Sequence, residues 1–191
     1  MQRTGGAHAA VGRARVLETA RQLFVRHGAA NVGINEVIAA AGIARMTLYN
    51  NFVSKEALIA AVYEEMSAET LADLARAVNP DLPERDRVLG VFDFFDRSAV
   101  DADFRGCPFI HASQQAAEAS GAVHEIVRAY KAQLRDHIAG VLDADRPDRG
   151  ELADQILLLL DGAVTEAHLK GVADPIGKAK RAATVLLRAT T

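Results

Sequence analysis

Hydrophobic residues recur at helical spacing along most of the chain. Over residues 12–27, the apolar positions Val16, Ala20, Leu23 and Phe24 are spaced i, i+4, i+7 and i+8, which is one face of an amphipathic helix. Similar patterns predict further helices over residues 34–41, 45–51, 55–78, 84–99, 105–118, 122–143, 149–170 and 175–189. Alternating runs of β-branched residues are missing, so we predict no strand. The expected fold class is all-α, with about nine helices.

Residues 33–56 contain two short helical patterns that meet at a glycine. Gly42 permits a tight turn between them because glycine readily adopts positive φ. Ser54 then provides a typical N-cap for the helix that follows residues 45–51. This arrangement is that of a helix-turn-helix, which points to DNA binding.

The second short helix has an apolar and a polar side. Its apolar residues, together with Val37 and Ile43, suit a three-helix core with Leu23 and Phe24, and its remaining side chains are free to face outward. Such side chains bond phosphates or base edges, and Lys55 lies at a helix N-terminus that favours phosphate. The alternative is a structural three-helix unit with an incidental polar face. The predicted DNA contacts are Gly33, Asn35, Arg45, Met46, Thr47, Tyr49, Asn50 and Lys55.

The net charge of −3 conceals an uneven distribution along the chain. Residues 1–55 contain seven basic and two acidic residues, which leaves the remainder with a net charge of −8. Neutralising DNA phosphates with basic side chains releases counterions, so the N-terminal part has the sign that DNA requires. The acidic remainder should be repelled by DNA and help to orient the basic end.

The same segment carries a set of family motifs. They are Ala20-Arg21-Gln22-Leu23-Phe24, His27-Gly28, Glu36-Val37, Ala41-Gly42-Ile43, Thr47-Leu48-Tyr49-Asn50-Asn51-Phe52 and Ser54-Lys55-Glu56-Ala57-Leu58. With these motifs, residues 13–65 resemble the TetR family of transcriptional regulators. The resemblance implies a homodimer that binds a palindromic operator in double-stranded DNA and, usually, a repressor that releases it when a small molecule binds. It also implies that Tyr49 and Lys55 contact phosphates.

The resemblance sets the domain organisation that we expect. Residues 1–10 are small and polar and are predicted to be a flexible tail. Residues 11–55 would form the DNA-binding domain, and residues 56–191 the ligand-binding and dimerisation domain. Two departures affect individual phosphate contacts: Gly33 stands where the family usually has Thr or Ser, and Ala44 where Ser is common.

Aromatic residues gather in the middle of the chain. Five of the seven phenylalanines fall within residues 92–109, and such clusters either line ligand pockets or fill the core. The pocket candidates are Phe92, Phe95, Phe104, Cys107, His111 and Gln114. An alternative function is thiol or redox sensing by Cys107. This residue lies near the start of a predicted helix, which would lower the pKa of its thiol, and His111 lies one turn further on. A buried, inert cysteine is the competing interpretation.

The last two predicted helices are candidates for a dimer interface. The helix over 149–170 is apolar on more than one side, and the last helix offers small residues that allow close approach. The alternative is a monomer in which both helices complete the core. The interface candidates are Leu152, Ile156, Leu159, Val164, Ala179, Ala183 and Leu186.

The sequence gives no sign of several other functions. The histidines lack metal-ligand spacing, and Cys107 with His111 has no third orienting group, so we expect no metal, no cofactor and no enzyme activity. No apolar run is long enough to span a bilayer. A single cysteine fits a reducing compartment, and we expect a cytoplasmic protein.

Overall fold

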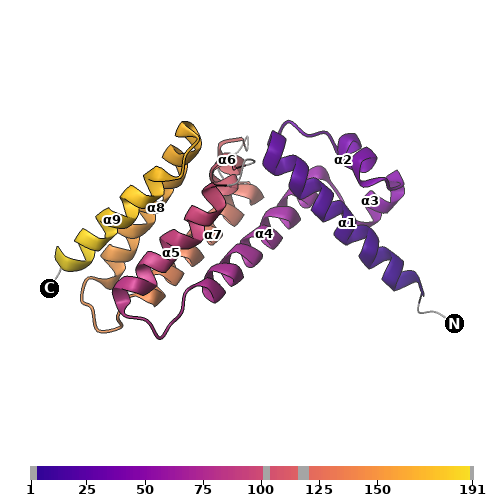
Figure 1. Cartoon of the computed structure of the whole chain (residues 1–191). Helices are drawn as coiled ribbons and strands as arrows, with labels where there is room; N and C mark the ends of the chain where they lie inside the picture. Colours follow the sequence, from indigo (N-terminus) through magenta and orange to yellow (C-terminus); the bar gives the residue numbers. More distant parts are fainter. Residues whose placement is uncertain (1–3, 101–103, 116–120, 190–191) are drawn as a thin grey trace. The chain divides into compact units, whose positions relative to one another are not determined.

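The computed structural model describes residues 4–100, 104–115 and 121–189, and within these ranges it is all-α, as predicted (Figure 1). Nine helices and no strand occur in the described ranges. The helices are α1 (Thr4–His27), α2 (Ile34–Ala41), α3 (Arg45–Asn51), α4 (Lys55–Ala77), α5 (Glu84–Ala99), α6 (Pro108–Gln115), α7 (Ala122–Val141), α8 (Arg149–Lys170) and α9 (Asp174–Ala189).

Most of these bounds lie within two residues of the prediction, and the starts of α1 and α6 differ by more. Helix α1 begins at Thr4 rather than at Gly12. The flexible tail predicted for residues 1–10 stays a prediction. Helix α6 begins at Pro108 rather than at residue 105. Gly106 has φ +81, which no helix accommodates, and proline is well suited to the first helical position. The predicted end of this helix at residue 118 lies outside the described residues.

The chain divides into two compact units. Unit one comprises Met1–Ser67 and Pro108–Arg128, and unit two comprises Ala68–Cys107 and Ala129–Thr191. Helices α4 and α7 each contribute residues to both units. The domain boundary predicted after residue 55 stays a prediction.

Unit one is built on the packing of α1 against α2 and α3 (Figure 1). Its core takes one face of α1 and the apolar side of the two short helices. In the same unit, Tyr63 of α4 meets Phe109 of α6 edge-on, with 5.8 Å between ring centroids. The buried side chains of the three N-terminal helices include Val16, Leu17, Ala20, Phe24, Val37, Leu48 and Phe52.

Unit two is built on α5, α8 and α9, and the last two helices lie side by side (Figure 1). Helix α8 ends at Gly171, whose φ of 64° allows the chain to turn directly into α9. One face of α8 is fully covered by its own chain, and α7 adds Leu134 and Ile138 to the same core. The covered residues of α8 are Leu152, Ala153, Ile156, Leu160, Ala163, Val164 and Ala167.

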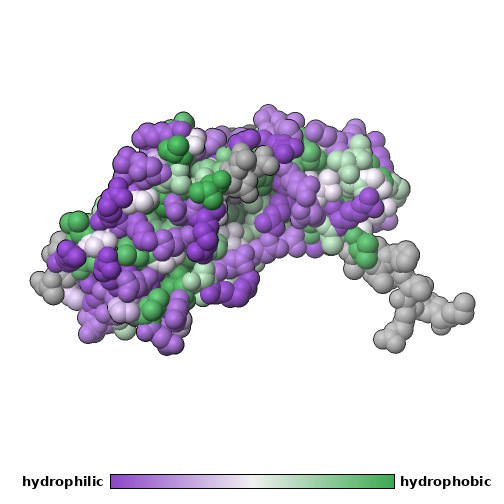
Figure 2. All heavy atoms as spheres, in the orientation of Figure 1, coloured by the Kyte–Doolittle hydropathy of each residue, from purple (hydrophilic) through white to green (hydrophobic). Residues whose placement is uncertain are grey.

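The surface is mainly polar on the face seen in Figure 2, with hydrophobic residues in scattered positions. In the part of the chain that the structure describes, no helix combines the length and the apolar character that crossing a bilayer requires.

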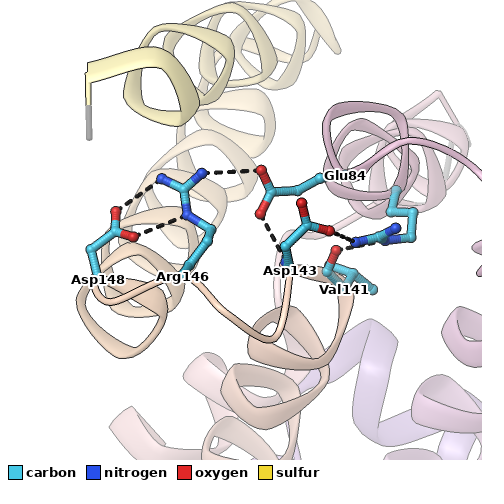
Figure 3. A network of polar contacts seen from close by, with 6 residues as sticks. Glu84, Val141, Asp143, Arg146 and Asp148 are labelled. Carbon is cyan, nitrogen blue, oxygen red and sulfur yellow. Dashed lines mark hydrogen bonds and ion pairs between the residues drawn. The ribbon is translucent and has the colours of Figure 1, made fainter. Parts of the chain in front are cut away.

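A network of ion pairs joins the start of α5 to the connection between α7 and α8 (Figure 3). The Arg146 guanidinium donates to both oxygens of Asp148, at 3.0 Å each, and to Oε2 of Glu84 at 3.1 Å. Oε1 of Glu84 accepts from the Asp143 backbone N–H at 2.8 Å, and Arg87 donates to the Asp143 carboxylate at 2.6 Å. Because these groups share partners and are partly shielded, the network stabilises more than isolated surface pairs would.

The same network explains why Asp148 does not cap α8. Asp148 occupies the N-cap position, but its side chain makes no cap hydrogen bond. Both of its oxygens are taken by Arg146. The sequence pattern of Asp148 with Glu151 three residues later predicts a capping box, and the structure does not form one.

Candidate nucleic-acid interface

The turn between α2 and α3 depends on Gly42. It has φ 60° and ψ 42°, the left-handed region, and its N–H donates to the carbonyl of Ala39 at 3.1 Å. The next N–H, that of Ile43, donates to the carbonyl of Ile38 at 3.3 Å. These two bonds form a Schellman motif, which ends α2 and directs the chain into α3.

The apolar side of α3 is buried as the sequence predicts. Leu48 and Phe52 are both buried, and so are Val37 of α2 and Phe24 of α1. Leu23 and Ile43, which we also expected in this core, are only half-buried. This anchoring fixes the rotation of α3, so that its other side chains point away from the core.

Four of the five expected contact residues on α3 are exposed. They are Arg45, Met46, Tyr49 and Asn50; Met46 is 67% exposed and Tyr49 is 37% exposed. The Arg45 guanidinium lies over the Tyr49 ring, 5.6 Å from its centroid, which restricts both side chains by a cation–π interaction. The arrangement offers a positioned cation and a phenol hydroxyl on one short helix. Their contact with DNA stays a prediction.

Thr47 lies differently from its neighbours. It is half-buried, and a Cβ built on Gly12 of α1 would lie 3.2 Å from Thr47 Cγ2. Its methyl group therefore packs on α1 at a point where a side chain larger than that of glycine would be tight. In addition, its carbonyl accepts from Nδ2 of Asn51 at 2.7 Å. Thr47 thus serves the packing of α3 against α1, a role that the polar-face interpretation did not include.

The start of α4 is capped as the sequence predicts. Ser54 Oγ accepts from the Ala57 N–H at 3.1 Å. The pKa of the Glu56 carboxyl is lowered, mainly because it accepts a hydrogen bond from the backbone N–H of Glu56 and secondly because of a hydrogen bond with the Ser54 side chain. Lys55 is half-buried, and its Nζ donates to the carbonyl of Ala30 at 3.3 Å. This bond ties the start of α4 to the turn between α1 and α2, and the phosphate contact predicted for Lys55 stays a prediction.

Both short helices begin without a side-chain cap. Gly33 and Ala44 occupy the N-cap positions of α2 and α3 in extended conformation, and neither makes a side-chain cap bond. A Cβ on Gly33 would meet nothing within 4 Å, so the position has room for the hydroxyl residue common in the family. Asn35 in the first turn of α2 is exposed, as expected for a contact residue.

Two basic residues of α1 lie beside the helix-turn-helix and were not among the predicted contacts. The Arg13 guanidinium lies 5.4 Å from the centroid of the Phe52 ring, and Arg15 Nη2 lies 3.2 Å from a Cβ built on Gly42. Both side chains are exposed. The excess of basic residues in the first 55 positions was the available signal, but sequence spacing alone could not place these two beside α3.

Comparison with known proteins agrees with this geometry. Residues 16–62 match the family model described as bacterial regulatory proteins of the tetR family. Two uncharacterized HTH-type transcriptional regulators of Mycobacterium tuberculosis are 40% identical over 70 residues, which is 35% of this chain. The matched region also covers only 35% of each of those relatives, so they bear on the N-terminal part alone.

Solved structures extend the similarity to the whole chain. A TetR transcriptional regulator from Streptomyces avermitilis is 30% identical, with 94% of this chain and 97% of that chain covered and a TM-score of 0.81. The chain belongs to the TetR family of transcriptional regulators. A TetR-family regulator from Streptomyces coelicolor, 24% identical with 100% and 97% coverage and a TM-score of 0.87, has the same fold. Members of the family are DNA-binding regulators and not enzymes, which confirms both expectations at the level of the family.

The pocket candidates of this TetR-family chain do not form one set. Phe92 is fully buried in the core of unit two, while Phe104 lines a hollow of about 580 Å³. The Phe104 ring meets the His168 ring edge-on at 6.4 Å between centroids. Phe95 and Cys107 are half-buried in unit two and do not line this hollow; His111 and Gln114 belong to unit one. Of the six candidates, Phe104 alone keeps a place at this hollow.

Most of the dimer candidates are core residues of a single chain. Five of them have almost no exposed surface, so a partner cannot cover them further: Leu152, Ile156, Val164, Ala179 and Ala183. These residues serve the core of the single chain, and their assignment to a dimer interface stays a prediction. Leu159 and Leu186 are half-buried. The apolar residues that α8 leaves exposed are Leu158 and Leu169, on its other side.

Cys107 is half-buried. Its proximity adds to burial in raising the pKa of Tyr130. The comparisons give no support to the thiol-sensing alternative. Among the described residues, no group of three or more His, Cys, Asp or Glu side chains is arranged to hold a metal ion.

Proposed function

We propose that this chain is a homodimeric repressor that binds a palindromic operator and releases it when a small molecule binds its helical C-terminal part. The observation that carries the proposal is the exposed face of α3, where Arg45 is held over Tyr49. An anchored apolar side and a free polar side are what a recognition helix needs to enter the major groove. Arg45 would donate bidentate hydrogen bonds to a guanine, and Tyr49 and Lys55 would bind phosphates.

A dimer is proposed because a palindrome presents two half-sites about 34–36 Å apart. The exposed residues of α8 support this, since Leu158, Gly162, Thr165 and Leu169 follow the spacing of one helical stripe. Leu158 is 73% exposed and Leu169 is 71% exposed, and Val185 of α9 is exposed as well. Covering this stripe with a second copy would remove large apolar side chains from water.

The small-molecule site is proposed for unit two. The hollow at Phe104 is bordered by Ala99 at the end of α5 and by Ala167 and His168 of α8. Its volume of about 580 Å³ falls in the range of small-molecule sites, and it combines apolar walls with an imidazole. A ligand there would release the operator only if it binds more tightly to the conformation that does not fit DNA.

The first test concerns DNA. Genomic fragments retained by the purified protein are sequenced, and the affinity for the selected sequence is compared with that for a scrambled duplex at fixed salt. We expect preference for the selected sequence, and Arg45→Ala should reduce that preference by removing a base contact worth about 1–3 kcal/mol. Arg85→Ala on α5, an exposed arginine paired with Asp86, is the control and should change neither affinity. Equal wild-type affinities for the two duplexes would reject the proposal.

The second test concerns the ligand. Small apolar metabolites are screened for thermal stabilisation, because a ligand that binds only the folded state raises the unfolding temperature. A hit should weaken operator binding, and Phe104→Ala should abolish its effect on both measurements. A stabilising compound that leaves operator affinity unchanged would contradict the release mechanism.

A further inference from the structure

Helix α1 crosses α3 at residues 12–16 and places one arginine at each end of it. Gly12 faces Thr47 in the middle of α3. Successive residues are 100° apart around a helix, so Arg13 and Arg15 emerge on opposite sides of the line through Gly12. Arg13 lies over Phe52, just after α3, and Arg15 lies over Gly42, just before it.

These two guanidinium groups, like that of Arg45, form no ion pair within the described part of the chain. Some arginines of unit two, in contrast, do form ion pairs. Arg85 pairs with Asp86 at 3.4 Å, and Arg135 pairs with Asp154 at 2.8 Å. Unit one therefore holds three uncompensated positive charges around one seven-residue helix.

We propose that Arg13 and Arg15 bind the phosphate rows on the two sides of the groove that α3 enters. This inference rests on the proposed function, in which α3 reads the major groove. A helix of seven residues is about 10 Å long, close to the groove width of about 12 Å. Groups held at its two ends are thus within reach of the phosphates that border the groove.

The contacts within the protein position these guanidinium groups without neutralising them. A cation–π contact with Phe52 restricts Arg13 but leaves its charge and its N–H donors available. Arg15 has the space over Gly42 because that residue has no side chain. Bidentate donors that are ordered before binding lose less side-chain entropy when a phosphate arrives. Duplex DNA is the occupant we favour over an acidic protein, because both arginines adjoin the exposed face of α3.

The salt dependence of operator binding tests this directly. The logarithm of the affinity falls linearly with the logarithm of the salt concentration, with a slope of about −0.9 for each neutralised phosphate. A dimer that loses one phosphate contact per subunit should therefore have a slope that is less steep by about 1.8. Arg13→Gln and Arg15→Gln should each show this reduction, with the ratio of operator to scrambled affinity unchanged. Arg15→Lys, which keeps the charge, should retain most of the slope, and Arg85→Gln should leave it unchanged.

Variants that retain the wild-type slope would overturn the inference. If Arg13→Gln fails to fold because it loses its contact with Phe52, Arg13→Lys and Arg13→Met separate the charge from the packing, since both keep an apolar stem. The lysine variant should keep the slope, and the methionine variant should lose it. A wild type that discriminates operator from scrambled DNA while both arginine variants keep its slope refutes only this inference. A wild type without discrimination refutes the proposed function itself.

Discussion

Gly28, at the turn after α1, is a position where one added methyl group should lower stability for two identifiable reasons. Its φ is +82, and a Cβ there would lie 2.4 Å from Nε2 of Gln115 and 2.6 Å from Oε1. Gln115, at the end of α6, also accepts from the Ala30 N–H at 3.4 Å. Gly28→Ala therefore introduces two separate problems, backbone strain and collision with a side chain.

Replacing Gln115 as well separates the two costs. An L-residue in the left-handed region costs about 1–2 kcal/mol. Displacing the Gln115 amide forfeits a long hydrogen bond and its packing, which adds about 0.5–1 kcal/mol. We thus expect Gly28→Ala to lower the free energy of unfolding by about 1.5–3 kcal/mol in the wild type and by about 1–2 kcal/mol in a Gln115→Ala background.

Urea denaturation of the four proteins in this cycle provides the measurement. Gly28→Asn in the Gln115→Ala background is the control, because asparagine tolerates the left-handed region and should cost less than alanine. A cost for Gly28→Ala that is the same in both backgrounds would show that Gln115 does not occupy the space beside Gly28. A cost near zero in the Gln115→Ala background would refute the strained turn itself.

Three further outcomes follow from the structure. Ala44→Ser should raise the free energy of unfolding by about 1 kcal/mol, seen as a higher urea midpoint, because it supplies the missing cap of α3; an unchanged midpoint would argue against that cap. Burial lowers the pKa of His137, so the unfolded chain takes up protons first and wild-type stability should fall as the pH drops below about 6.5. His137→Asn should flatten this dependence in thermal melts, and an identical profile would exclude His137 as its source. Leu158→Glu should give a monomer in sedimentation analysis, whereas a persistent dimer would place the interface elsewhere.

The helix ends were largely predictable because single residues determine them. Gly28 and Gly42 adopt positive φ as required, Ser54 forms its cap, and α9 starts at Asp174 before Pro175. These residues act on the backbone next to them, so their effect can be predicted from the sequence without knowledge of the tertiary structure. Where a side chain has a competing partner the prediction fails, as when Arg146 takes both oxygens of an expected cap.

Which side of a helix is buried was less predictable, because this depends on packing between segments that are distant in the sequence. Helix α8 is apolar on two sides, and its sequence does not say which side its own chain covers. The structure covers the side of Ile156 and leaves Leu158 exposed, so most of the residues expected at an interface lie in the core of the single chain. Likewise, the outward face of α3 followed from its own pattern, while the approach of Arg13 and Arg15 needed the crossing of α1.

The segment from Arg105 to Phe109, which contains Cys107, includes a glycine whose conformation serves the packing of the chain. Gly106 turns with φ +81 while lying against α8, where a Cβ would come within 3.3 Å of the His168 Cβ. Any larger residue would have to twist the backbone and push the two segments apart. The glycine in this segment is thus accounted for by the close approach of two segments of the chain, and no reactivity of the neighbouring Cys107 is needed to explain it.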